Sequence, residues 1–161
     1  MLVSNKHKQI IEERFAVVRE NAKNRETELF AILDTCTEDE AICLKYLYAF
    51  MPEQDLANHD GELFLKFVRQ ALKVRQIVPW GDKLTGGLFL NYVLQYRMSN
   101  ENIEYYKDDF FEELYPRIEG KSMKEAALII NYWCFEKATY LTTDSRTTCP
   151  LTTIRNAYGR C

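Results

Sequence analysis

The stretch SMKEAALIINYWCFEK, from Ser122 to Lys137, decides the fold class of this chain. Ser122 followed by Glu125 has the form of a capping box, in which the Ser hydroxyl accepts a hydrogen bond from the third helical amide and the Glu carboxylate reaches back. The apolar side chains that then recur at helical spacing on one side are Met123, Ala126, Ala127, Ile130, Trp133 and Cys134. The stretch therefore predicts an amphipathic helix that buries this side.

The same periodicity predicts further helices upstream, over residues 6–22, 25–34, 37–51, 62–77 and 103–118. Thr37 and Glu40 repeat the capping box, Pro52 should end that helix, and residues 53–60 should form a polar loop. The segment VPWGDKLTGG at 78–87 indicates a loop, and residues 88–95 fit either a helix or a strand. We expect a mainly α fold, a bundle-like array of six or seven helices followed by a long irregular C-terminal stretch.

The composition excludes several classes of protein. Hydrophobic residues make up 47% of the 161 residues and charged residues 28%, which is the balance of a globular protein. The 21 basic and 24 acidic side chains are mixed along the chain, so we expect no nucleic-acid partner. Apolar runs such as Ala126 to Ile130 are far shorter than the ~18 residues of a membrane span, so none is expected.

Cysteine spacing gives no sign of a metal or a cofactor. The five cysteines include no CxxC pair and no zinc-like spacing with the two histidines, so we expect no metal ligands and no cofactor. Cys36, Cys43 and Cys134 lie in apolar helical patterns and are interpreted as buried thiols. The N-terminal residues contain no signal-peptide pattern, which fits a cytoplasmic protein, or a secreted one whose leader has been removed.

Other candidate groups have simpler explanations. Asp108, Asp109, Glu112 and Glu113 supply carboxylates for an acid/base pair, yet on a helix they are like charges that should face solvent. His7 and His59 lie in polar segments and are interpreted as surface residues.

The last thirty residues carry the most specific pattern. NYWCFEK at 131–137, Tyr140, Asp144-Ser145-Arg146 and TIRNAYGRC at 153–161 resemble the region that leads into the core of bacterial transglutaminase-like proteins. The upstream stretches PWG at 79–81, FLNYVL at 89–94 with Tyr96-Arg97, and GKSM at 120–123 are also similar to the helical region before such a core. The resemblance covers roughly the second half of the chain.

The resemblance implies a function for the last residue. In this superfamily a Gly-x-Cys step presents the nucleophile, here Cys161, and a histidine and an aspartate on later strands of a papain-like fold complete a Cys-His-Asp triad. We therefore expect a helical domain at 1–138 and an irregular segment at 139–161 that leads into a truncated transglutaminase-like core. The parent would perform thiol-dependent acyl transfer or amide hydrolysis, and this fragment should be inactive alone. Some transglutaminases use an upstream Trp as a transition-state donor, but for Trp133 a core position is the favoured interpretation.

The expected partners follow from the same hypothesis. They are the remainder of the chain's own transglutaminase-like domain, a protein or peptide substrate, and a second copy bound through apolar surface that the missing core leaves exposed. The alternative hypothesis is a non-catalytic helical module that binds a protein or a glycan through the aromatic loop around Trp80.

Overall fold

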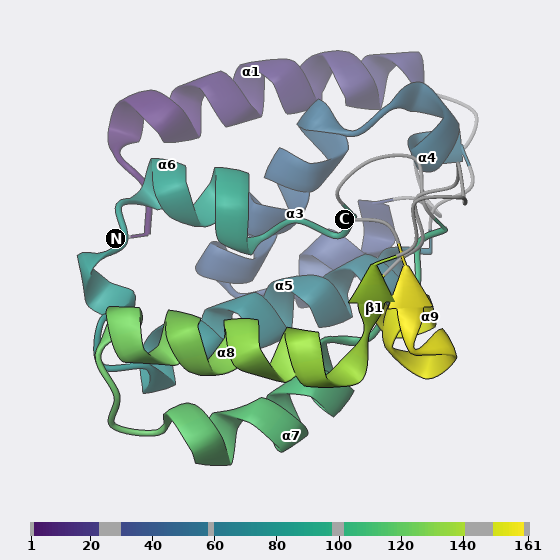
Figure 1. Cartoon of the computed structure of the whole chain (residues 1–161). Helices are drawn as coiled ribbons and strands as arrows, with labels where there is room; N and C mark the ends of the chain where they lie inside the picture. The colour runs from purple at the N-terminus through teal and green to yellow at the C-terminus, as the bar shows by residue number, and fades with distance from the viewer. Residues whose placement is uncertain (1, 23–29, 58–59, 98–101, 141–149, 160–161) are drawn as a thin grey trace. The chain divides into compact units, whose positions relative to one another are not determined.

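The structure, a computed structural model, describes residues 2–22, 30–57, 60–97, 102–140 and 150–159. These residues are mainly helical, which confirms the predicted fold class (Figure 1). They divide into a first compact unit, Met1–Val74 with Asp82–Gln95, and a second, Arg75–Gly81 with Tyr96–Cys161. The domain expected at 1–138 includes parts of both units, and the boundary at residue 138 stays a prediction.

The first unit contains most of the N-terminal helices. Its elements are α1 (Asn5–Asn21), a 3₁₀ turn (Ala31–Thr35), α3 (Glu38–Phe50), α4 (Glu53–Ala57), α5 (Gly61–Ile77, whose last residues belong to the second unit), α6 (Gly86–Leu88) and a π-helical turn (Phe89–Val93). A further 3₁₀ turn, Gly81–Lys83, lies where the two units meet in the sequence. The predicted capping box starts α3: Glu40 N donates to Thr37 Oγ1 at 3.4 Å, and Thr37 N donates to Glu40 Oε2 at 2.8 Å.

The core of the first unit includes three mutually packed aromatic rings. Phe15 of α1 meets Phe30 edge-on at a centroid distance of 5.2 Å and stacks on Tyr48 of α3 at 6.2 Å, and Phe30 lies 5.6 Å from Tyr48. All three are buried, and such pairs contribute about 0.5–1.5 kcal/mol each beyond the burial of their area. This cluster joins α1 to α3.

Several local predictions for the first unit were wrong. Residues 53–57 form α4 instead of a polar loop, because the carbonyl of Pro52 accepts from the amides of Asp55 and Leu56 and so begins a new helix. The described part of the helix expected at 25–34 is a 3₁₀ turn. Of the stretch 88–95, for which the sequence fits either a helix or a strand, residues 88–93 are helical, and Thr85 Oγ1 caps α6 by accepting from Leu88 N at 3.3 Å.

The second unit contains α7 (Lys107–Ile118), α8 (Met123–Lys137), β1 (Thr139–Tyr140), α9 (Pro150–Asn156) and β2 (Tyr158–Gly159). The capping box of Ser122 and Glu125 is present at the start of α8, as predicted. The predicted buried side of α8 is only partly right: Ala126 and Trp133 are buried, whereas Met123, Ala127 and Cys134 are exposed. The described parts of residues 139–161 also include α9 and two short strands.

Candidate functional site

The chain approaches residue 161 through α9 and β2. β2 pairs in parallel with β1, with Thr139 opposite Tyr158 and Tyr140 opposite Gly159. Thr139 N donates to the carbonyl of Ala157 at 2.9 Å and so extends the pair. Cys161, the predicted nucleophile, lies outside the described residues, but the strand that precedes it ends only two residues earlier.

Ala157 forms the sharp corner between α9 and β2. Its φ of 57° is in the left-handed region, where a residue with a Cβ is disfavoured by about 1–2 kcal/mol. Its amide donates to the carbonyl of Ile154 at 3.2 Å, which closes the last turn of α9. Thr152 Oγ1 also donates to Glu104 Oε2 at 3.3 Å. These contacts fix the direction in which β2 leaves the helix.

Trp133 is a core residue of the second unit, as the favoured interpretation of the sequence has it. The residue is 3% exposed, and its ring packs edge-on against Phe110 of α7 at a centroid distance of 5.3 Å. Its Nε1 donates to Glu113 Oε1 at 2.8 Å. Because this N–H already has a strong acceptor, the geometry gives no support to Trp133 as a donor to a reacting oxygen.

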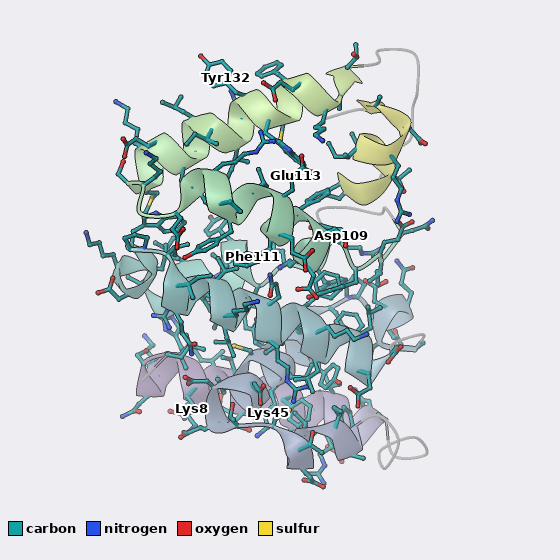
Figure 2. All side chains as sticks on the ribbon, turned by 90° about the horizontal axis from the view of Figure 1, so that it is seen from below. Lys8, Lys45, Asp109, Phe111, Glu113 and Tyr132 are labelled. Atoms are coloured by element: carbon teal, nitrogen blue, oxygen red, sulfur yellow. The ribbon has the colours of Figure 1, made fainter. Side chains whose placement is uncertain are left out.

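Glu113 organises the contact between α7 and α8, and Figure 2 shows it between the two helices. Lys137 Nζ lies 2.8 Å from Glu113 Oε1, and Arg117 approaches the same oxygen at 3.7 Å. The hydrogen bond from Lys137 and that from Trp133 hold the pKa of Glu113 below its ordinary value. Sequence reasoning missed this role, although the i,i+4 spacings Glu113–Arg117 and Trp133–Lys137 were a usable signal.

The remaining carboxylates of α7 are exposed, as the sequence predicted. Asp108, Asp109 and Glu112 are exposed, and Glu113 is tied into the ion pairs described above. The four therefore do not form an acid/base pair.

Among the described residues, no group of three or more His, Cys, Asp or Glu side chains could hold a metal ion. In the same part of the chain, no helix has both the length and the apolar run needed to cross a bilayer.

The outer side of α8 is apolar and uncovered. Leu128, Tyr132 and Phe135 follow one another at spacings of four and three residues and are 50%, 67% and 75% exposed. Figure 2 shows Tyr132 projecting from α8 on the side away from α7. Side chains of this size in a row on one helix are typical of a surface that another layer covers.

The described cysteines differ in environment. Cys43 is fully buried, as predicted, and burial raises the pKa of the partly buried Cys36 thiol, which donates to the carbonyl of Ile32 at 3.3 Å. Cys134 is exposed, so its predicted burial was wrong. His7 lies in the first turn of α1, where Ser4 Oγ accepts from its amide at 3.3 Å and also lies 3.1 Å from its ring Nδ1, and His59 lies outside the described residues. The contact between Ser4 and His7 is a local one, three residues apart, at the cap of α1.

A hollow of about 520 Å³ in the first unit is lined by residues of α1, of the 3₁₀ turn Ala31–Thr35 and of α3. Phe15 and Phe30 supply apolar lining, and both carboxylate oxygens of Glu12 accept from Lys45 Nζ at 2.9 Å. Lys45 also lies 5.6 Å from the centroid of the Phe15 ring. Glu12 and Lys45 thus pair with each other inside the hollow, which Arg19 and Asp34 also line.

Comparison of the chain with protein-family models, with curated proteins and with solved structures finds no match.

Proposed function

We propose that this chain is the helical region of a transglutaminase-like cysteine acyltransferase or peptidase, with Cys161 as its nucleophile. The observation that carries the proposal is the parallel pair β1–β2, whose second strand ends two residues before Cys161. In open sheets of parallel strands, reacting groups and ligands gather beyond the carboxyl ends of the strands. Cys161 would thus lie just beyond the carboxyl end of β2, the end of a parallel strand where reacting groups usually lie.

The pair β1–β2 is also smaller than the sheets in which parallel strands usually occur. Parallel strands are normally found buried in larger sheets, and two strands alone are marginally stable. Within the described residues the sheet has only these two strands. Helix α8 leads directly into β1, and its exposed apolar side is typical of a surface that another layer covers. Both features support a further lobe, the remainder of the transglutaminase-like domain, as the principal partner.

The proposed chemistry is acyl transfer through a thioester. The Cys161 thiolate attacks the carbonyl carbon of a carboxamide, and the C–N bond breaks as the leaving amine takes up a proton. An amine or a water molecule then attacks the thioester, gives up a proton and releases the thiol. A free thiol with a pKa near ~8.5 is only a few per cent ionised at neutral pH, so the reaction needs the histidine that the resemblance implies after Cys161.

The alternative, a binding module that uses the loop around Trp80, has less support from the geometry. Trp80 is partly buried, and the turn is closed by Gly81 N donating to the carbonyl of Val78 at 3.0 Å. The Nε of Arg75 donates to the carbonyl of Gly81 at 3.2 Å. A Cβ on Gly81 would lie 1.8 Å from the carbonyl oxygen of Arg75, so the turn requires glycine for close packing. The loop therefore has a structural role that accounts for its residues.

The test uses the gene product that continues past residue 161. Incorporation of a fluorescent primary amine into casein measures transamidation, release of ammonia without amine measures hydrolysis of side-chain carboxamides, and new casein fragments measure peptide-bond cleavage. We expect one of the three activities, abolished by Cys161→Ala and retained in Cys134→Ala, which removes an exposed thiol elsewhere in the second unit. The 161-residue chain alone should show none of them. Activity that survives Cys161→Ala, or a reading frame without a downstream histidine, would refute the proposal.

A further inference from the structure

The hollow of the first unit has an apolar floor. Phe15 of α1 and Phe30 line it and are only 5% and 7% exposed, so they form its deep part. Alanines supply further lining from three different elements, at Ala16, Ala31 and Ala41, and their short side chains leave the space open. The volume of about 520 Å³ lies within the range of roughly 300–1,000 Å³ that is usual for sites of small organic ligands.

Charged side chains of both signs surround this floor. Lys45 of α3, labelled in Figure 2, donates to both carboxylate oxygens of Glu12 of α1 at 2.9 Å, so these two charges compensate each other. Asp34 and Arg19 also line the hollow, and both are exposed, which places them at its mouth. Within the described part of the chain, Asp34 is not within ion-pair distance of any cation.

The balance of these charges selects among small ligands. The described lining contains two carboxylates and two cations and so has no net charge. A ligand with a single charge would meet one of the two mouth groups with its own sign, and an uncharged apolar ligand would cover the Asp34 carboxylate without giving it a partner, which costs free energy. A zwitterion can pair with both mouth groups, because the five N–H donors of a guanidinium fit a carboxylate at two points.

We propose that this hollow binds a small zwitterion with an apolar side chain, which is the chemistry of a free apolar amino acid or of a short apolar peptide. The ammonium group of the ligand pairs with Asp34 and its carboxylate with Arg19, while its side chain lies on Phe15 and Phe30. The site belongs to the first unit alone, and the binding is independent of the chemistry proposed for Cys161.

The experiment follows the backbone amide resonances of the isotope-labelled chain by NMR during titration with L-leucine and, separately, with the dipeptide leucyl-leucine. Each ligand is compared with a form acetylated at its amine and a form amidated at its carboxylate, so that one charge is removed at a time. The variants Asp34→Asn and Arg19→Gln remove the two mouth charges of the protein. Ala16→Leu fills the hollow, and the control Val17→Leu enlarges the next side chain of α1, which is 58% exposed and outside the lining.

We expect at least one of the two unblocked ligands to shift the amides of the lining alanines, and its blocked forms to bind at least about tenfold more weakly. Binding of L-leucine alone identifies a free amino acid as the ligand, and binding of leucyl-leucine alone identifies a peptide. Ala16→Leu should abolish the shifts, and Val17→Leu should bind as the wild type does.

The two charge variants separate the proposal from misfolding. Asp34→Asn should lose affinity only for ligands with a free amine, and Arg19→Gln only for ligands with a free carboxylate, a division that a misfolded chain cannot produce. The absence of shifts around the hollow, equal binding of blocked and unblocked ligands, or binding that neither charge variant changes would overturn the proposal.

Discussion

Substitution of Gly86 by alanine should weaken the first unit strongly, whereas the same change at Gly87 should not. A Cβ on Gly86 would lie 2.4 Å from the carbonyl oxygen of Leu2 and 2.9 Å from Val3 Cγ1. A Cβ on Gly87 would meet only His7 Cε1 at 3.8 Å, an ordinary contact. Figure 1 shows α6 beside the N-terminal end of α1, where these residues meet.

The magnitude follows from what has to move. Ordinary contacts begin near 3.4 Å, so the Leu2 backbone must retreat by roughly 1 Å or leave its place. Leu2 and Val3 are each 5% exposed, and undocking forfeits about 1.5–3 kcal/mol for each side chain. Full loss of both side chains from the core would sum to about 3–6 kcal/mol, and a backbone shift that keeps them partly docked costs less, so we expect Gly86→Ala to lower the free energy of unfolding by about 2–4 kcal/mol. Gly87→Ala should raise it by up to about 1 kcal/mol, since alanine is favoured over glycine in a helix.

Urea unfolding of the two variants, followed by far-ultraviolet circular dichroism, measures this difference. Both substitutions add one methyl group at adjacent residues of α6. Helix propensity alone therefore predicts the same change in the free energy of unfolding for Gly86→Ala and Gly87→Ala. Limited proteolysis should also cleave the N-terminal residues of Gly86→Ala sooner than those of Gly87→Ala. Equal stability of the two variants would refute the close approach of Leu2 to Gly86.

Three further predictions concern the turn before β2 and the start of α3. Ala157→Gly should leave the stability unchanged or raise it by up to about 1 kcal/mol, because glycine accepts the positive φ at little cost, and Ala157→Val should lower the melting temperature. Thr37→Ala should cost about 1 kcal/mol in urea unfolding by removing the cap of α3, and Thr37→Ser much less. The backbone N–H of Thr37, with help from Arg69, lowers the pKa of Glu40, so this stabilisation is complete above the unfolded-state pKa near ~4.3 and is lost as pH falls through the lower folded-state value. Glu40→Gln should therefore flatten the acid limb of a stability–pH curve; an unchanged limb would contradict the assignment.

Local sequence rules predicted the two capped helix starts because capping depends on neighbours in the chain, whereas α7 begins at Lys107, four residues after its predicted start. Thr37 with Glu40 and Ser122 with Glu125 mark the two capping boxes that the structure contains. The rules did not predict α4, because its first turn is closed by backbone hydrogen bonds alone. The amides of Asp55 and Leu56 donate to the carbonyl of Pro52. The candidate nucleophile rests on a resemblance of the last thirty residues, and its placement stays a prediction because Cys161 lies outside the described residues.

The burial of α8 shows why periodicity alone cannot identify a core side. This helix has two apolar sides: Ala126, Ile130 and Trp133 follow the same spacing of four and three residues as Leu128, Tyr132 and Phe135. The hydrogen bond from Trp133 to Glu113 and the Trp133–Phe110 contact explain which side faces α7.

A helix that is apolar on both sides normally lies between two layers. In the described part of the second unit, α7 supplies one layer over the Trp133 side of α8, and the opposite side remains exposed. The helix then runs directly into β1, the first strand of the parallel pair. Tyr132 and Phe135 lie on the last two turns of α8, the turns that lead into this pair. One added layer that extended the sheet and covered this side of α8 would therefore fit the lobe that we propose to follow Cys161.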